Sequence, residues 1–370
     1  MKILILSYYN PWISGGGHRP VCFLEQDLKR DDEIFFVFFS KLECENMKKY
    51  SLYYKKNLKL ILYRDNKDFV AMNFQSDEII NENYIINKWK PDYVRAHNPV
   101  ESYISLIKKC RSKDIPFVYD QMDYWDDFPV KPWGDVEKTY MELSTKCITI
   151  SNWLKEYNKQ KSKKDFNVVP NGIKKSFVDV LYADEQSILE KNNNQRKTVL
   201  YMGAMWPEWY DWDLTIQLVS TYCDYKFIFV GSYLPNSDEN DGRDLSGIVE
   251  QLKKYPNVTF VGQVEHQKLI QYLKCADIGI IPFIVNKITQ ACSPLKCFEY
   301  IAAYLPVVTT ALPEIKEYPL VYYSNNKEEF IKNIEKAIDF KYTSESYKRV
   351  NLFNSENTWE KKILKLYEKE

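Results

Sequence analysis

The chain has 370 residues, of which 45% are hydrophobic and 28% charged, a composition typical of a soluble globular protein and a length that favours two domains. Lysine plus arginine and aspartate plus glutamate balance at 51 each, so the charge gives no argument for nucleic-acid binding. Eight scattered cysteines without a C-x-x-C pair favour reduced cytoplasmic thiols over metal ligation.

Nothing in the sequence predicts a membrane-spanning protein. The first residues, MKILILSYYNPW, carry one lysine and few strongly apolar residues before Ser7, which predicts a first strand and not a secretion signal. No later apolar run is long enough to cross a bilayer. We therefore expect a cytoplasmic protein whose only membrane contact is peripheral, at the inner face.

The first half of the chain alternates short apolar strands with helices. We expect strands at 3–7, 34–39, 59–63, 93–96, 116–119, 147–150 and 167–169, and helices at 20–30, before Trp89, at 100–112 and from Ser151. This alternation predicts a parallel, doubly wound sheet.

The alternation restarts after a polar segment, 179–197, that has the composition of a linker. We expect strands at 198–202, 226–230 and 258–261 and helices at 213–221, 266–275 and 359–370. The sequence thus predicts two Rossmann-like α/β domains, at 1–178 and 196–342, followed by a helical segment at 343–370.

The stretch 280–310 shows where a ligand is expected. It predicts a buried strand, an irregular loop, a helix beginning near Ser293, a break at Leu305-Pro306 and a second buried strand. A helix start at the carboxyl end of a parallel strand offers free N–H groups and a positive dipole end, which suit a phosphate.

Three glycines, Gly15 to Gly17, follow the first strand, but they do not complete a dinucleotide fingerprint. The third glycine position is Pro20, and the second strand ends in Ser40 and Lys41 with no acidic residue. The loop is predicted either as a hinge that brings backbone close to a ligand or as a flexible turn.

Several segments together resemble the GT-B glycosyltransferases of the family 4 type. These are the VPNGI turn, the glycine-ended strand at Gly203, VTFVGQV, and SPLKCFEYIAAYLPVVTT. The resemblance covers most of the chain and implies two Rossmann-like domains that face each other across a cleft, with the last helix packing back on the first domain. It also implies a nucleotide sugar as co-substrate, with no metal ion and no other cofactor.

The resemblance assigns donor-binding roles to residues of the second domain. Glu299 would accept hydrogen bonds from ribose hydroxyls, N–H groups of Ser293, Leu295 and Lys296 would cradle the diphosphate, and Val264 would pack on the nucleobase. The other donor-binding positions are Gly16 and Gly17 of the first loop, Asn171 and Gly172 of the turn, and Gly203. A solvated helix residue at Glu299 and an ordinary Asn-Gly turn at 171–172 are the alternatives.

The chain departs from the family pattern in two places. Ala291 stands where the first glutamate of E-x7-E is usual, and the segment after Gly203 lacks the usual arginine and lysine. Stabilisation of the departing diphosphate would then need another cation, for which Lys296, Lys287 and Arg19 are the candidates.

Catalytic candidates in the first domain follow buried strands. His97 is placed to bond a sugar hydroxyl or to act near the reacting carbon, and Asp120 or Asp123 would serve as a general base if the enzyme inverts. The alternatives are a structural histidine and helix capping by Asp123 or Asp126. His18 and His266 are too far from any paired ligand pattern to indicate a site.

The pair Asp211 and Asp213 has the D-x-D spacing of a metal motif, but it precedes a helical run, which favours helix capping. The sequence as a whole predicts a glycosyltransferase that moves a sugar from a nucleotide-diphosphate sugar to a glycan or lipid-linked acceptor in surface polysaccharide biosynthesis. The alternatives are a nucleotide-sugar epimerase of the same fold and a catalytically impaired partner subunit that binds a nucleotide sugar.

Overall fold

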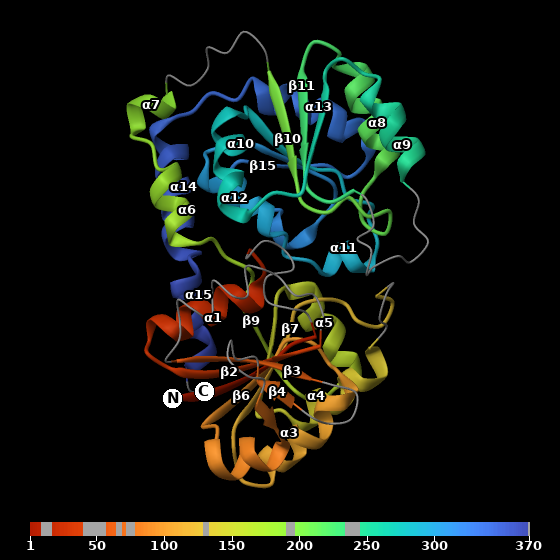
Figure 1. Cartoon of the computed structure of the whole chain (residues 1–370). Helices are drawn as coiled ribbons and strands as arrows, with labels where there is room; N and C mark the ends of the chain where they lie inside the picture. Colours follow the sequence, from red (N-terminus) through yellow and green to blue (C-terminus); the bar gives the residue numbers. More distant parts are fainter. Residues whose placement is uncertain are drawn as a thin grey trace. The chain divides into compact units, whose positions relative to one another are not determined.

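The computed structural model describes residues 1–8, 17–39, 57–63, 69–71, 78–128, 133–189, 197–233 and 245–368. The chain forms two compact units (Figure 1). Unit 1 comprises Met1–Pro170 and Ile363–Glu370, and unit 2 comprises Asn171–Lys362. Gly16, residues 190–196 of the expected linker and the segment 234–244 lie outside the described residues.

Within its described residues, unit 1 holds a nine-stranded sheet in the order β5-β4-β3-β2-β1-β6-β7-β8-β9. The strands are β1 (Lys2–Leu6), β2 (Glu33–Phe38), β3 (Leu58–Tyr63), β4 (Phe69–Ala71), β5 (Glu78–Ile80), β6 (Tyr93–Ala96), β7 (Phe117–Gln121), β8 (Lys146–Thr149) and β9 (Phe166–Val168). All pairings are parallel except those of β4. The central strands are continuous apolar runs because both faces of the sheet are covered.

The helices of unit 1 connect these parallel strands. They are α1 (Arg19–Lys29), a π-helical turn (Tyr84–Trp89), a 3-10 turn (Glu101–Tyr103), α3 (Ile104–Arg111), α4 (Gly134–Leu143) and α5 (Asn152–Lys161). Pro20 lies in the first turn of α1, where its missing N–H costs nothing, and Ser151 caps α5 by accepting from the Leu154 N–H. The end of α15 (Trp359–Tyr367) also belongs to this unit.

The described part of unit 2 holds a six-stranded parallel sheet in the order β12-β11-β10-β13-β14-β15. Its strands are β10 (Thr198–Met202), β11 (Lys226–Val230), β12 (Val258–Gly262), β13 (Ile278–Ile281), β14 (Val307–Thr309) and β15 (Val321–Tyr323). The order changes direction between β10 and β13, which makes this position the topological switch point of the sheet.

Helices cover both faces of the unit 2 sheet (Figure 1). They are α6 (Lys175–Leu181), α7 (Glu185–Leu189), α8 (Trp212–Thr221), α9 (Ser246–Lys253), a 3-10 turn (His266–Lys268), α10 (Leu269–Cys275), α11 (Lys287–Ala291), α12 (Leu295–Ala302), a second 3-10 turn (Pro313–Ile315), α13 (Lys327–Ile338) and α14 (Ser344–Glu356). The architecture is therefore the doubly wound α/β arrangement expected for both halves of the chain.

Three local expectations need correction. The loop after β13 is not wholly irregular, because Asn286 forms a capping box that starts the short helix α11. The next helix begins at Leu295, since Pro294 takes the extended N-cap conformation, so Ser293 precedes the helix. Asp120 lies inside β7 and not beyond its end. A buried carboxylate is tolerated within a strand only when it is paired.

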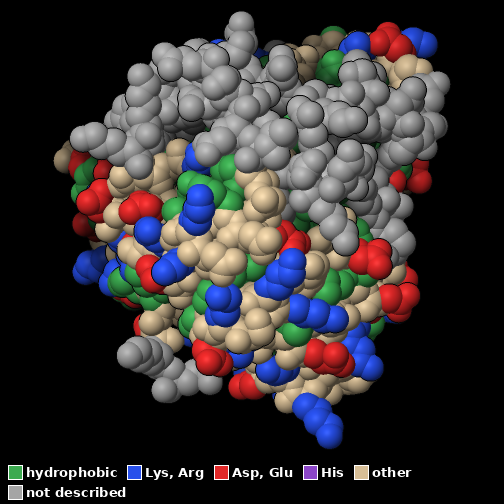
Figure 2. All heavy atoms as spheres, turned by 60° about the horizontal axis from the view of Figure 1, so that its bottom comes forward, with side chains coloured by type: hydrophobic (Ala, Val, Ile, Leu, Met, Phe, Trp, Pro, Cys, Tyr) green, Lys and Arg blue, Asp and Glu red, His purple; other side chains and the backbone are tan. Residues whose placement is uncertain are grey.

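Figure 2 shows basic and acidic side chains interspersed over the described residues of the face that it displays. Within the described residues, no helix is both long enough and apolar enough to span a membrane. No disulfide joins the cysteines of that part of the chain.

Candidate functional site

The switch point of the unit 2 sheet is built around Gly203 and Lys296. Gly203 ends β10 with a φ of +123°, a conformation that favours glycine. A Cβ atom at this position would lie 3.0 Å from Cε and 3.1 Å from Nζ of Lys296, which comes from the first turn of α12. The absence of a side chain at residue 203 therefore makes room for the lysine ammonium.

The Lys296 ammonium occupies an aromatic cradle. Its Nζ lies 4.9 Å from the ring centre of Tyr201 on β10 and 4.5 Å from that of Phe283, just after β13. Among the described residues no carboxylate forms an ion pair with it. Burial lowers the pKa of Lys296 to about 8. A partly desolvated cation that forms no ion pair with a described carboxylate favours a bound anion.

The start of α12 adds main-chain donors to this cation. Pro294 at the N-cap offers no side-chain cap, so the N–H groups of Leu295 and Lys296 are left for another acceptor. Ser293, by contrast, is engaged: its Oγ accepts from the Asn171 N–H at 3.2 Å, and its carbonyl accepts from Asn171 Nδ2 at 2.6 Å. Asn171 thus holds the turn before α12 in place.

Gly172 follows Asn171 at a point of close backbone approach. A Cβ atom there would lie only 2.6 Å from the Asn357 carbonyl oxygen, so any side chain would push the two segments apart. The segment 171–172, for which an Asn-Gly turn was predicted, is therefore a site of close packing between two backbone segments of unit 2. Val264, two residues beyond β12, is half-buried and packs against the core of the same unit.

Glu299 lies one turn along α12 and is also buried. Its Oε1 is 2.6 Å from Nε2 of His266, which belongs to the 3-10 turn after β12. The ring of His266 stacks on Phe177 of α6, with centroids 4.4 Å apart. From the sequence His266 was expected to lie too far from any paired ligand pattern to indicate a site. Its partner, Glu299, is remote in the chain, so no local spacing could have indicated this pair.

Unit 1 carries a buried ionic cluster at its own switch point, between β1 and β6. Arg19 donates to both carboxylate oxygens of Asp120, from Nε at 2.9 Å and from Nη2 at 2.8 Å. Nδ1 of His97 lies 2.8 Å from the same carboxylate. Burial alone would raise the pKa of Asp120, but Arg19 and His97 together hold it well below its usual range. Asp120 is therefore a charged and fully engaged carboxylate.

His97 is neutral in this cluster, since burial lowers its pKa. The neutral ring donates its Nδ1–H to Asp120, which leaves Nε2 unprotonated. That nitrogen is buried and has no hydrogen-bond partner among the described residues. His97 thus presents a lone pair that nothing in the described chain uses.

Asp123 is in a different state from Asp120, although the sequence presents them as a pair. Burial raises the pKa of Asp123 to about 7, against the opposing charge of Arg19. It accepts no hydrogen bond from another described residue. Next to the cluster, burial lowers the pKa of His18 to about 4, and Gly17, the described part of the glycine loop, is half-buried.

The region that holds the Lys296 site is matched by a known family. Residues 196–339 match the model of glycosyl transferases group 1. This match lies within unit 2 and includes Gly203, Val264, His266, Lys296 and Glu299.

Part of the chain is also similar to TuaH of Bacillus subtilis (strain 168), whose name provisionally assigns it to teichuronic acid biosynthesis as a glycosyltransferase. The two are 26% identical over 222 residues, which cover 55% of this chain and 53% of TuaH. The match therefore spans about half the length of that relative.

Solved structures share the two-domain arrangement. Alr3699/HepE from Anabaena, solved in complex with UDP-glucose, has a TM-score of 0.70 at 13% identity and 99% coverage of both chains. UDP-GlcNAc 2-epimerase from Methanocaldococcus jannaschii has a TM-score of 0.54, again at 13% identity and 99% coverage of both. These likenesses confirm the predicted GT-B fold. Because one neighbour is an epimerase, the fold alone does not fix the reaction.

The D-x-D pair in the group 1 region has a structural explanation. Asp211 caps α8 by accepting from the Leu214 N–H at 2.9 Å, and its carboxylate forms an ion pair with Lys327 at 2.8 Å. Asp213 is exposed in the first turn of the helix. Helix capping was the role that the sequence favoured for this pair.

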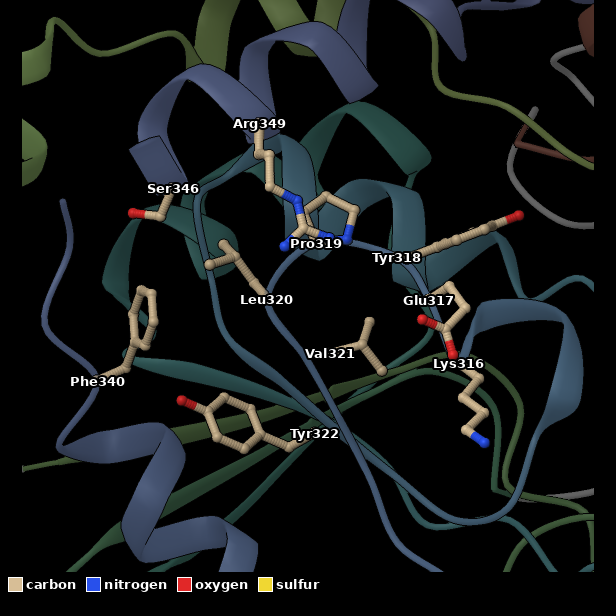
Figure 3. Close-up of a pocket in the computed structure, with 10 residues that line it drawn as sticks. All are labelled: Lys316, Glu317, Tyr318, Pro319, Leu320, Val321, Tyr322, Phe340, Ser346 and Arg349. Carbon is tan, nitrogen blue, oxygen red and sulfur yellow. The ribbon is translucent and has the colours of Figure 1, made fainter. Parts of the chain in front are cut away.

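Two pockets in unit 2 lie at opposite edges of the sheet. A pocket of about 330 Å³ is lined by Lys316–Tyr322, Phe340, Ser346 and Arg349 (Figure 3). Leu320 precedes β15, so this pocket lies at the amino end of the strand, away from the edge where α/β sheets bind ligands. A pocket of about 380 Å³, which includes Phe283, Thr310 and Ser324, lies at the carboxyl edge.

Proposed function

We propose that the chain is a glycosyltransferase of the family 4 type, which transfers a sugar from a nucleotide-diphosphate sugar to a glycan or lipid-linked acceptor. The observation that carries this proposal is the Lys296 ammonium, held without a carboxylate partner among the described residues at the switch point of the group 1 region. A diphosphate is the anion best suited to a cation and helix N–H groups placed together.

Each part of the donor then has a partner on unit 2. The diphosphate would bind Lys296 Nζ and the N–H groups of Leu295 and Lys296, and the ribose would donate to Glu299, whose carboxylate only accepts. The nucleobase would pack near Val264. No further cofactor enters this proposal.

The reaction breaks the bond between the anomeric carbon and the diphosphate oxygen and forms one from that carbon to an acceptor hydroxyl. Negative charge grows on the departing diphosphate, and Lys296 would stabilise it. The acceptor hydroxyl must also lose its proton. In unit 1, Asp123, whose pKa burial raises to about 7, is able to accept a proton near neutral pH. Nε2 of His97 has an unused lone pair and would accept from a sugar hydroxyl, because burial keeps the ring neutral.

The position of Lys296 favours an enzyme over an impaired binding subunit. The segment after Gly203 lacks the usual arginine and lysine, and this lack motivates the impaired alternative. However, Lys296 brings an ammonium to within about 3 Å of the Cβ position of Gly203. A local cation is thus present despite the missing motif.

Surface polysaccharide assembly is the setting that the comparisons support best. The name of TuaH places that relative in teichuronic acid biosynthesis, and Alr3699/HepE was solved with UDP-glucose. We therefore take uridine nucleotides as the first donors to test and a growing surface glycan as the acceptor class.

A thermal-shift screen of UDP, GDP, ADP and CDP tests the donor site directly. A nucleotide at a hundred times its dissociation constant stabilises the protein that binds it by about 2.7 kcal/mol, so one of the four should raise the melting temperature clearly. If none of the four shifts it, the proposed donor site is wrong. Conversion of a nucleotide sugar to its epimer without any acceptor would instead favour the epimerase.

A further inference from the structure

Glu299 and His266 form a buried pair in unit 2. Their side chains are 8% and 13% exposed, and Nε2 of His266 lies 2.6 Å from Oε1 of Glu299. The second carboxylate oxygen, Oε2, accepts no hydrogen bond from any described residue. One oxygen is therefore held by the protein and the other is left for a ligand.

The histidine ring is itself fixed in position. It stacks on Phe177, with an angle of 22° between the ring planes and 4.4 Å between centroids. Phe177 is buried, and its helix α6 packs against α12, which carries Glu299, and against α10, which follows the turn of His266. The ring plane is thus set by a core side chain and not by the ligand.

A glutamate carboxylate adopts a single orientation only when a fixed hydrogen-bond partner, such as the His266 ring, holds one of its oxygens. The last torsion of glutamate is broad, so a carboxylate without a partner rotates freely about its axis. A hydrogen bond to Oε1 from a fixed ring selects one rotation and aims Oε2. Preorganisation of this kind lowers the cost of ordering the site when a ligand binds.

We propose that His266 is a positioning residue for the donor ribose. It donates its Nε2–H to Oε1 of Glu299 and thereby aims Oε2 at the ribose 2′-hydroxyl, while Phe177 fixes the plane of the imidazole. This inference rests on the proposed function, because it takes Glu299 as the ribose acceptor. It adds a residue of the turn after β12 to that function.

The test compares ribose discrimination in three proteins. UDP and 2′-deoxy-UDP are titrated by calorimetry into the wild type, His266→Phe and His266→Gln, with GDP and 2′-deoxy-GDP as a second pair. Phenylalanine keeps the stacking ring and removes the donor, whereas glutamine replaces the ring with an amide N–H. Melting temperatures of the three proteins, measured without nucleotide, report any loss of folding.

We expect the wild type to prefer the ribonucleotide about tenfold or more, because a hydrogen bond to a charged group is lost in the deoxy form. His266→Phe should lose most of this preference at nearly unchanged melting temperature, and His266→Gln should regain much of it. Full preference in His266→Phe would overturn the inference. An equal loss of affinity for the ribonucleotide and the deoxyribonucleotide in His266→Phe would also overturn it, since that result indicates only a structural role.

Failure of the proposed function gives a different result. If the wild type binds none of UDP, GDP, ADP and CDP, the donor site itself is wrong and the inference falls with it. If it binds UDP and 2′-deoxy-UDP equally well, nucleotide binding stands but the ribose 2′-hydroxyl does not donate to Glu299. That outcome overturns the role of His266 alone.

Discussion

Lys296 is the residue on which the donor site depends most. A neutral side chain of similar length, Lys296→Met, keeps the packing against Tyr201 and Phe283 and removes the charge. Loss of a hydrogen bond to a charged phosphate costs about 1.5–3 kcal/mol, so nucleoside diphosphate affinity should fall about tenfold to a hundredfold in calorimetry.

The matched control is Lys253→Met, which removes an exposed lysine of α9 whose partner is Glu250. The affinity of Lys253→Met for the nucleoside diphosphate should equal that of the wild type. Wild-type affinity in Lys296→Met would contradict the assignment of Lys296 as the ligand of the diphosphate. Because the pKa of Lys296 lies at about 8 in the free protein, wild-type affinity should also decline as the pH rises above 8 and the ammonium loses its proton.

Asp123 gives a prediction about stability and pH. Its pKa is raised by burial to about 7, above the pKa of an aspartate in the unfolded chain. Between these two pKa values the folded protein binds a proton at Asp123 that the unfolded chain does not bind. The stabilisation is complete below the unfolded pKa and is lost as the pH rises through 7. Asp123→Asn lacks this dependence.

Urea unfolding at pH 5 and pH 8 measures the difference. The free energy of unfolding of the wild type should fall relative to that of Asp123→Asn between these two values. The same pH dependence in both proteins would show that Asp123 is not the titrating group. Asp120→Asn is the contrasting variant: it breaks a buried pair and should cost about 3–5 kcal/mol at pH 7.

At the scale of elements, α12 serves as both a structural and a binding element. Its apolar face, with Phe298, Tyr300 and Ile301, is buried in the core of unit 2. Its first turn carries Lys296, and Glu299 follows one turn later. A helix held so firmly by its core face keeps the positions of its ligand-binding residues well defined.

The end of α15 packs within unit 1 largely through the side chain of Tyr367. Tyr367 donates to Asp27 Oδ1 at 2.6 Å, and the same carboxylate forms a buried ion pair with Arg95 at 2.5 Å. Arg30 lies over the Tyr367 ring, 4.1 Å from its centroid. The end of the chain is thus tied to α1 and β6.

Tyr367→Phe should therefore lower the free energy of unfolding by about 1.5–3 kcal/mol in urea denaturation, since a hydrogen bond to a charged group is lost. Tyr347→Phe is the control, because its hydroxyl bonds the exposed Tyr182 hydroxyl and the carbonyl of the half-buried Ala183, and neither partner is charged. It should change the free energy by less than about 0.5 kcal/mol. Equal effects of the two substitutions on the free energy of unfolding would show that the hydrogen bond from Tyr367 to Asp27 contributes no more than one between uncharged groups.

Elements were easier to predict from the sequence than contacts. The strands at 198–202 and 226–230 have the bounds expected for them, because buried parallel strands are unmistakable apolar runs. The contact of Glu299 with His266 and the charge difference between Asp120 and Asp123 were missed. Both depend on long-range packing and burial, which no local spacing encodes.

The whole molecule repeats one layout in two units. Each has a doubly wound parallel core with polar side chains at the switch point, namely Lys296 in unit 2 and the Arg19, His97 and Asp120 cluster in unit 1. The repeated alternation of strands and helices made this fold predictable, since each half buries its own apolar face. The family match covers only the second unit, so the proton acceptors of unit 1 stay predictions.

Release of nucleoside diphosphate from donor sugars tests most directly whether the protein is a glycosyltransferase that uses Lys296 at the diphosphate. UDP-glucose, UDP-N-acetylglucosamine and GDP-mannose are incubated with the wild type, Lys296→Met and Lys253→Met, with and without a saccharide acceptor. We predict that at least one donor is consumed and that Lys296→Met alone lowers the rate about a hundredfold, as for loss of one group that stabilises developing charge. Equal rates in all three proteins, or no release from any donor, would contradict the account.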